Sequence, residues 1–78
     1  MASSTPVLKK GSKGEAVSRL QEGLQALGYH VGPIDGDFGP KTVKAVKAFQ
    51  TDNGLAADGI VGPKTWKTFE ERWAHLSQ

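Results

Sequence analysis

Catalysis and metal binding need particular side chains at particular spacings, and the chain offers few candidates. The two histidines, His30 and His75, have no His-Glu-x-x-His spacing around them, and no cysteine is present to act as a nucleophile or thiolate ligand. Asp35 and Asp37 could begin a calcium loop, but the twelfth position, where an EF-hand needs a bidentate acid, is Val46. We therefore expect no catalytic residue, no metal and no cofactor.

An irregular calcium site is the one metal alternative that the sequence leaves open. It would use the carboxylates of Asp35, Asp37 and Asp58. Aspartate in an Asp-Gly turn more often accepts hydrogen bonds from its own backbone. We therefore favour a role for these residues in forming turns.

Side chains in turns are better candidates for binding a ligand. Tyr29, Phe38, Ile60 and Val61 lie in turn regions, where binding residues concentrate. We expect these four apolar or aromatic side chains to be partly exposed and to supply apolar contact.

Two glutamines lie on or beside apolar stripes. At about 100° per residue, Gln50 falls inside the stripe of Val43, Val46 and Phe49, and Gln21 borders the stripe of the preceding helix. A buried amide needs hydrogen-bond partners. Each glutamine therefore either ties down the backbone of an adjacent turn, which we favour, or lines a ligand pocket.

Trp66 and Trp73 could be a platform for stacking on sugars. They share one helical arc with Phe69 and Leu76, so we interpret them as core, with Trp73 nearer the edge.

Three lysines, Lys41, Lys44 and Lys47, share the opposite helix face from Val43, Val46 and Phe49. Such a row could meet anionic polymers such as nucleic acid, but it is more typical of the solvated side of an amphipathic helix. A DNA-reading helix-turn-helix fits poorly, because neither later helix begins with a set of Arg, Asn or Gln for base edges.

An internal repeat predicts the helices and turns that must position these residues. Residues 35–42, Asp-Gly-Asp-Phe-Gly-Pro-Lys-Thr, recur at 58–65 as Asp-Gly-Ile-Val-Gly-Pro-Lys-Thr, with six of eight positions identical. Glycine permits the turn, and proline suits the first position of a helix. Each copy therefore predicts a helix start, at Pro40 and at Pro63, and the two turns are expected at related positions in the fold.

A further helix is predicted before the repeat. Ser12 and Glu15 have capping-box spacing, Val17, Leu20, Leu24 and Leu27 fall within one arc, and Gly28 stops the helix. The second helix ends at Asn53-Gly54. No segment alternates with period two, apart from a short extended entry at Val7-Leu8. The predicted fold is all-α, a compact three-helix bundle with two Asp-Gly/Gly-Pro turns.

Length and charge allow one small domain. The chain has 78 residues and a formal net charge of +2, too slight to indicate nucleic acid or membrane. Residues 1–6 lack the features of a signal peptide and are interpreted as a linker or expression remnant, and residues 7–78 as the domain. No membrane span is expected.

These patterns make the chain similar to the peptidoglycan-binding domain family, the helical type attached to cell-wall hydrolases. The similarity runs from Leu8 through Thr68. Its matching parts are residues 8–17, Leu20-Gln21, Leu24, Leu27-Gly28-Tyr29, residues 31–40, Ala45-Val46-Lys47-Ala48-Phe49-Gln50, Gly54-Leu55 and residues 58–66.

The resemblance implies a non-catalytic domain that binds bacterial peptidoglycan (murein), through its stem peptide or its glycan. It also implies a covalently tethered lytic or modifying enzyme, and action at the cell wall, outside the cytoplasm. We expect a monomer that binds neither nucleic acid nor membrane. Two alternatives stay open, a structural or protein-recognition domain without a glycan ligand and a nucleic-acid binder sensitive to salt.

The predicted ligand site is a shallow groove formed by the end of the first helix and the two Asp-Gly turns. Backbone amides there would favour the carboxylates of stem peptides. The predicted site residues are Tyr29, Asp35, Gly36, Phe38, Gln50, Asp58, Ile60, Val61 and Gln21.

Overall fold

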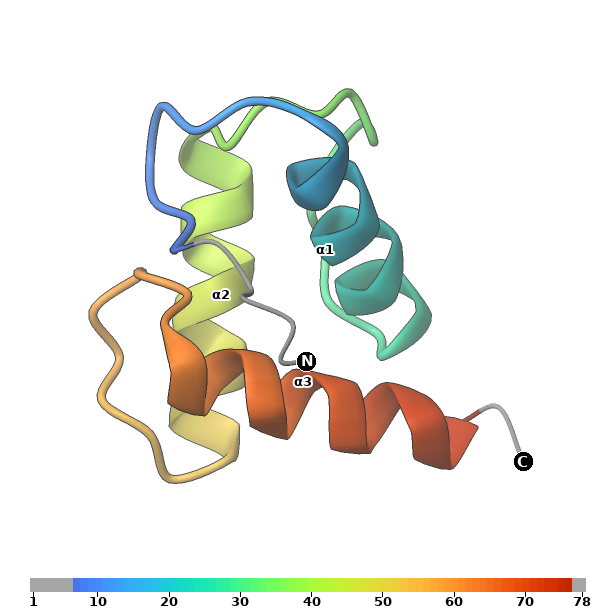
Figure 1. The fold of residues 1–78 in the computed structure, drawn as a ribbon, viewed down its shortest axis with the longest axis vertical. Helices are drawn as coiled ribbons and strands as arrows, with labels where there is room; N and C mark the ends of the chain where they lie inside the picture. Colours follow the sequence, from blue (N-terminus) through green and yellow to red (C-terminus); the bar gives the residue numbers. More distant parts are fainter. Residues whose placement is uncertain (1–6, 77–78) are drawn as a thin grey trace, which may run out of the picture.

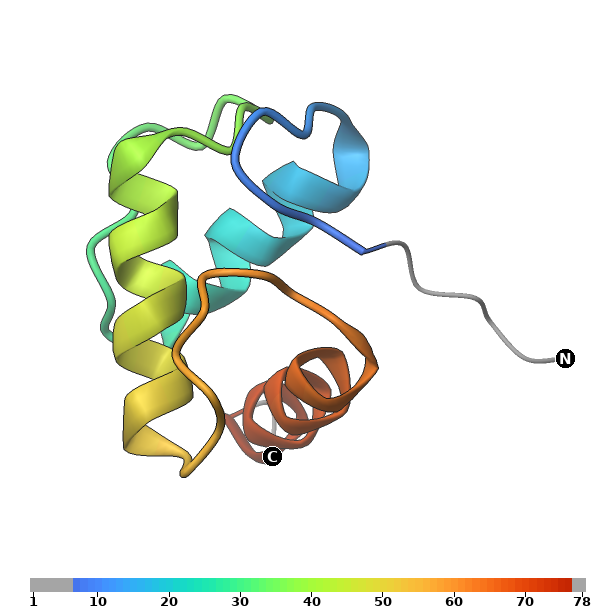
Figure 2. The same cartoon turned by 90° about the vertical axis from the view of Figure 1, so that its left-hand side faces the viewer.

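The fold consists of three helices joined by two long turns. A computed structural model describes residues 7–76 and contains α1 (Glu15–Ala26), α2 (Pro40–Asp52) and α3 (Pro63–Leu76). α1 and α2 lie side by side, and α3 crosses their lower ends (Figures 1 and 2). Within these residues there is no strand, only two isolated antiparallel bridges. The predicted all-α, three-helix class is confirmed.

The later two helices begin where the repeat predicts. Gly39 caps α2 with an extended backbone and Pro40 takes its first turn, while the amide of Trp66 donates to the carbonyl of Gly62 at the start of α3 (2.9 Å). Proline lacks an N–H and is preset for this position, so the first turn loses nothing by its presence. Both predicted helix starts, at Pro40 and at Pro63, are confirmed.

The predicted capping box of α1 is wrong. The N-cap is Gly14, without a side-chain cap, and Oγ of Ser12 accepts instead from the amide of Lys9 at 3.0 Å. A cap at Ser12 would require Lys13 to be helical, but Lys13 forms a bridge with Asp37. Pairing with the turn at Asp37 therefore delays the start of the helix to Glu15.

The first two helices end in the same way. Gly28 (φ 99°) and Gly54 (φ 72°) adopt the left-handed conformation that ends a helix. The amide of Tyr29 donates back to the carbonyl of Leu24 at 2.9 Å, and Leu55 closes α2 with an equivalent bond of 2.8 Å. The predicted stops at Gly28 and at Asn53-Gly54 are confirmed.

The core is formed by one face of each helix together with apolar residues of the connecting segments. Aromatic rings cross it edge to face, with Phe69 at centroid distances of 6.2 Å from Phe49, 5.6 Å from Trp66 and 5.4 Å from Trp73. Trp66 is buried and Trp73 is half-buried, as predicted, whereas the side chain of Leu76 lies outside the described residues. The buried apolar residues are Leu8, Val17, Leu20, Leu24, Val31, Phe38, Ala45, Val46, Phe49, Val61, Trp66 and Phe69.

α1 and α3 approach closely at a glycine. A Cβ atom added to Gly23 would lie 2.6 Å from Cε1 of Phe69 and 2.8 Å from Cε3 of Trp73, and it would overlap Cζ of Phe69. The two aromatic rings therefore pack directly on the backbone of α1, which leaves no room for a side chain at this position.

The segment before α1 pairs with both turns. Leu8 exchanges two backbone hydrogen bonds with Val61 (2.8 and 3.1 Å), and Phe38 donates to the carbonyl of Ser12 (2.9 Å) and accepts from the amide of Gly11 (3.0 Å). The extended entry predicted at Val7-Leu8 is thus present as a bridge at Leu8. No helix within residues 7–76 has the length and apolar character needed to cross a lipid bilayer.

Candidate functional site

The first copy of the repeat (residues 35–42) is held by a buried glutamine on α1. Nε2 of Gln21 donates to Oδ1 of Asp35 (3.3 Å), to the carbonyl of Asp37 (2.9 Å) and to Oγ1 of Thr42 (3.1 Å). Its Oε1 accepts from the amide of Gly36 at 3.0 Å. One amide side chain thus satisfies groups from both ends of the turn.

The second copy (residues 58–65) is held in the same way by Gln50 on α2. Nε2 of Gln50 donates to Oδ1 of Asp58 (3.1 Å), to the carbonyl of Ile60 (2.9 Å) and to Oγ1 of Thr65 (3.2 Å), and Oε1 accepts from Gly59 (3.0 Å). The two turns therefore occupy equivalent positions, as the repeat predicts.

The favoured interpretation of the two glutamines is confirmed. Gln21 is 1% exposed and Gln50 is 0% exposed, and their amide groups are engaged by the turns. They hold the turns in place, while direct contact of either side chain with a ligand stays a prediction.

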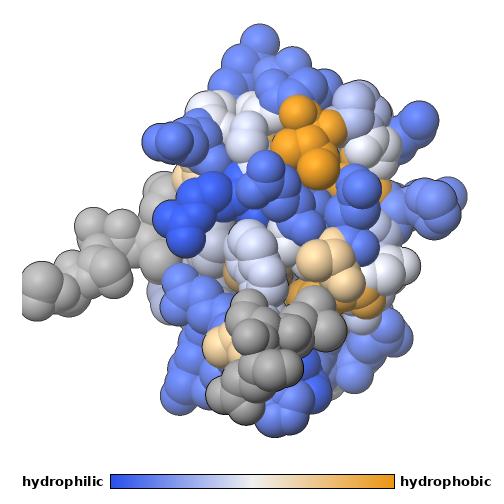
Figure 3. Space-filling model, turned by 90° about the vertical axis from the view of Figure 1, so that its right-hand side faces the viewer, coloured by the Kyte–Doolittle hydropathy of each residue, from blue (hydrophilic) through white to orange (hydrophobic). Residues whose placement is uncertain are grey.

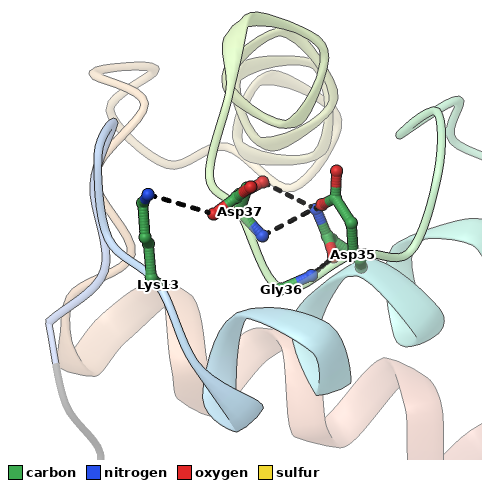
Figure 4. A network of polar contacts seen from close by, with 5 residues as sticks. Lys13, Asp35, Gly36 and Asp37 are labelled. Atoms are coloured by element: carbon green, nitrogen blue, oxygen red, sulfur yellow. Dashed lines mark hydrogen bonds and ion pairs between the residues drawn. The ribbon is translucent and has the colours of Figure 1, made fainter.

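One carboxylate oxygen of Asp35 takes part in the turn, and the other points outward. Oδ1 accepts from the amide of Asp37 at 2.9 Å, and the second oxygen points away from the network (Figure 4). Asp37 itself faces the exposed Lys13, at 3.8 Å. The amide of Asp37, and next the side chain of Gln21, hold the pKa of Asp35 below its usual value, because both donate to the charged form.

The equivalent aspartate has the same surroundings. The amide of Ile60 donates to Oδ1 of Asp58 at 2.9 Å, and this bond holds the pKa of Asp58 below its usual value. Both aspartates are therefore ionised at neutral pH.

Each copy of the repeat lines a hollow in the surface. The first hollow has a volume of about 320 Å³ and the second about 400 Å³. Both are lined by an aspartate, a Gly-Pro pair, a lysine and a threonine from their own copy. These residues are Asp35, Gly39, Pro40, Lys41 and Thr42 in the first hollow, and Asp58, Gly62, Pro63, Lys64 and Thr65 in the second.

The two hollows differ in their remaining walls. Asp37 and Pro33 line the first, whereas Ile60 and Ala56 take the corresponding places in the second. Ile60 is 41% exposed, in agreement with the prediction for this residue. The second hollow therefore has an exposed isoleucine where the first has an aspartate.

The predicted exposure of Phe38 and Val61 is wrong. Phe38 is 2% exposed and Val61 is 0% exposed. Their backbones pair with the segment before α1, and their side chains join the core, where they occupy equivalent places in the two copies of the repeat. Replacing either one would disturb packing and would not test a ligand contact.

Tyr29 lies apart from the hollows of the repeat. Its ring is half-buried against Phe49, at a centroid distance of 5.9 Å, and its hydroxyl donates to Oδ2 of Asp52 at 2.6 Å. It borders two other depressions, one with Gln25 and His30 and one with Asp52 and Arg72. The structure thus places Tyr29 outside a shared groove with the two turns, and each turn has its own hollow.

The hydrogen bond of Tyr29 predicts a change in stability at high pH. Burial, and next the hydrogen bond to Asp52, raise the pKa of Tyr29 from 10.0 to about 12. The raised pKa means that folding favours the protonated phenol, so this stabilisation is complete below pH 10 and is lost as the pH rises toward 12.

Phenolate absorbance reads this group directly, because the chain contains a single tyrosine. We expect the absorbance midpoint near pH 12 in the folded protein and near pH 10 in denaturant. The unfolding free energy of Tyr29→Phe should fall less than that of the wild type as the pH rises from 10 to 12. A folded-state midpoint equal to that in denaturant would contradict the assignment.

The alternative calcium site is not formed. Within residues 7–76, no group of three or more His, Cys, Asp or Glu side chains is placed to hold a metal ion. Asp35 and Asp58 each accept from the backbone of their own turn. The lysine row of α2 is solvent-exposed, as predicted.

The chain is thus a small three-helix domain whose two turns each carry a surface hollow. The family described as "Putative peptidoglycan binding domain" matches residues 13–69. The chain therefore belongs to the peptidoglycan-binding domain family, a family of non-catalytic modules, and the resemblance seen in the sequence is confirmed.

The relatives of this domain include cell-wall enzymes. The chain is 52% identical over 62 residues to the zinc D-Ala-D-Ala carboxypeptidase of Streptomyces albus G, with 76% of the chain and 24% of that protein covered. The spore cortex-lytic enzyme of Bacillus cereus is 42% identical over 64 residues, with 82% and 25% covered. The chain spans about half or less of the length of the curated relatives it matches.

Solved structures give the same picture. The SleB N-terminal domain superposes with a TM-score of 0.86 at 38% identity, covering 92% of this chain and 99% of that one. The Burkholderia AP3 phage endolysin superposes with a TM-score of 0.78 at 48% identity, covering 82% of this chain and 24% of that one.

Proposed function

We propose that this domain binds peptidoglycan through the surface around its two turns and holds a covalently attached cell-wall enzyme at its substrate, outside the cytoplasm. The observation that carries this proposal is the pair of hollows formed by residues of the family pattern. The names of its relatives, an endolysin, a carboxypeptidase and a cortex-lytic enzyme, support the same function.

The exposed members of the predicted site would make the contacts. Asp35 and Asp58 present charge, and Ile60 presents apolar surface at the second hollow. The buried members, Gly36, Phe38, Gln50, Val61 and Gln21, would support the turns, and Tyr29 would contribute from its separate position. A weak site of this kind is useful because tethering raises the concentration of an enzyme at a repetitive, insoluble substrate.

Sedimentation with purified sacculi tests this function. We expect the 78-residue chain to sediment with sacculi at low and at moderate salt, and to remain in solution with cellulose or chitin. Absence from the sacculus pellet under all conditions would overturn the proposal. Retention that disappears at moderate salt would instead indicate adhesion by charge alone.

Ile60 and Ile34 offer a matched pair of variants. They are 41% and 40% exposed, but Ile60 lines the second hollow and Ile34 lines neither hollow of the repeat. Ile60→Ser should weaken retention on sacculi about fivefold or more. The reason is that burial of the apolar side chain of Ile60 by a bound ligand would contribute roughly 1 kcal/mol to the binding free energy. Ile34→Ser should bind like the wild type, and equal losses in both variants would contradict the placement of the site.

On the face shown in Figure 3, a protein-recognition surface has less support. The face shown in Figure 3 is mostly hydrophilic, and its apolar spots are separate from one another. A docking surface for a protein partner would be expected to form a larger contiguous apolar patch.

A further inference from the structure

The two copies of the repeat share most of their chemistry as well as their position, with Asp37 of the first hollow replaced by Ile60 in the second. Each turn is held by the same four hydrogen bonds to a buried glutamine, and each hollow is lined by the same five residue types. We propose that the domain contains two corresponding ligand subsites, one in each hollow, and that each binds a peptide segment carrying both an ammonium and a carboxylate group. This inference rests on the proposed function and specifies a stoichiometry of two and the stem peptide as the part bound.

Each hollow offers a carboxylate oxygen to the ligand. The hydrogen bonds that Asp35 and Asp58 make within residues 7–76 use Oδ1. Figure 4 shows the second oxygen of Asp35 directed away from the turn. This oxygen can accept a hydrogen bond from a ligand ammonium without disturbing the turn.

Each hollow also offers an ammonium group. Lys41 lines the first hollow and Lys64 the second, and both are exposed. Within the described part of the chain, the ion pair found within 4.0 Å joins Lys13 to Asp37, so neither lysine is paired with the aspartate of its own hollow. The ammonium can therefore bind a carboxylate of the ligand.

Opposite charges on the walls of one hollow select the kind of ligand. A polyanion would meet the aspartate, and a polycation would meet the lysine, so either would leave one like-charge contact. A segment with both charges satisfies both walls. Hollows of about 320 and 400 Å³ are of a size that accepts one or two amino-acid residues.

Amide chemical shifts distinguish the two subsites. The probe is a soluble disaccharide-tetrapeptide, released from sacculi by a muramidase, that carries a free ammonium and a free carboxylate. We expect titration of the full chain to shift the amides of Asp37 and Gly39 at the first hollow and those of Ile60 and Gly62 at the second, with two probe molecules bound per chain.

Lysine variants assign each response to its own hollow. Lys41→Gln should weaken binding at the first hollow about tenfold or more, the usual effect of removing a charged hydrogen-bond partner, and leave the second unchanged. Lys64→Gln should do the reverse. Lys44→Gln is the matched control, because this exposed lysine of α2 lines neither hollow. Asp35→Asn and Asp58→Asn keep the oxygen that closes each turn and should show the same selective losses.

Several results would overturn the inference. These are one bound probe per chain, shifts at one hollow only, equal losses at both hollows in either lysine variant, or a loss in Lys44→Gln as large as in Lys41→Gln. Binding of a disaccharide without a peptide, or unchanged binding after acetylation of the ammonium, would also contradict it. The chain would still sediment with sacculi in these cases, whereas failure of the proposed function would abolish sedimentation.

Discussion

Gln50→Ala is expected to lower the free energy of unfolding by about 3 kcal/mol, and Gln21→Ala by a similar amount. Each removes an amide whose two N–H hydrogens, shared among three acceptors, and one oxygen are worth roughly 1 kcal/mol apiece. In the Gln50 variant the amide of Gly59, which is buried, loses its acceptor. Small domains are stable by roughly 5–15 kcal/mol. The loss should therefore be a large fraction of the total, and denaturant melts followed by circular dichroism would measure it.

Two further variants separate the hydrogen bonds from packing. Gln50→Met keeps most of the volume but removes the donors and the acceptor, so we expect it to remain strongly destabilised. Gln25→Ala on the exposed side of α1 is the control and should change the unfolding free energy by less than about 0.5 kcal/mol. Wild-type stability of Gln50→Met would show that packing, and not the amide, holds the turn.

Gly23→Ala is expected to destabilise the domain by about 3 kcal/mol, since inserting a methyl group into a packed core commonly costs up to that amount. Helix propensity alone predicts that Gly23→Ala stabilises the domain, because alanine is more favourable than glycine in a helix interior by about 1 kcal/mol. The difference arises from Phe69 and Trp73, which lie where the new Cβ would be placed. Thermal and denaturant unfolding decide between the two signs.

Gly39→Ala is a suitable comparison. Gly39 has a φ of −101°, which any residue can adopt, and an added Cβ would have no neighbour within 4 Å. Because Gly39 is the N-cap of α2, where alanine is less favourable than glycine, this variant should lose no more than about 1 kcal/mol of stability. A more stable Gly23→Ala would show that α3 moves away from α1 at little energetic cost.

The sequence was sufficient to predict the elements whose signals are local. The Gly-Pro pairs mark the starts of α2 and α3, and Gly28 and Gly54 mark the helix ends, because the conformations of proline and glycine are set by their own backbones. The role of Gln50 could also be inferred, since an amide within an apolar stripe must find partners and the nearest polar groups belong to the following turn.

Features that depend on long-range pairing were missed. The burial of Phe38 and Val61 follows from their pairing with Ser12 and Leu8, which lie far away in the sequence. A signal was available, because both are apolar residues at the same position of the repeat. The false capping box has the same origin, since Lys13 pairs with Asp37 and cannot enter the helix.

The site was predicted as one groove, and the structure resolves it into separate places. Sequence motifs identify Asp35 and Asp58 as turn residues, but not that each turn has its own hollow. Tyr29 follows a helix end and is half-buried against Phe49, so its location depends on how α1 packs on α2. The spacing of residues within a motif does not determine how two helices pack on each other. An interior glycine such as Gly23 signals close approach, but not the identity of its neighbour.

The two backbone hydrogen bonds between Leu8 and Val61 have a consequence for folding during synthesis. Leu8 leaves the ribosome before α1, and its partner Val61 emerges only after α1 and α2 have been translated. Contacts of such high sequence separation form late, because the long intervening loop must first be closed. The nascent domain should therefore acquire resistance to proteases only after Val61 has emerged, and a fragment cut short before Val61 should be degraded.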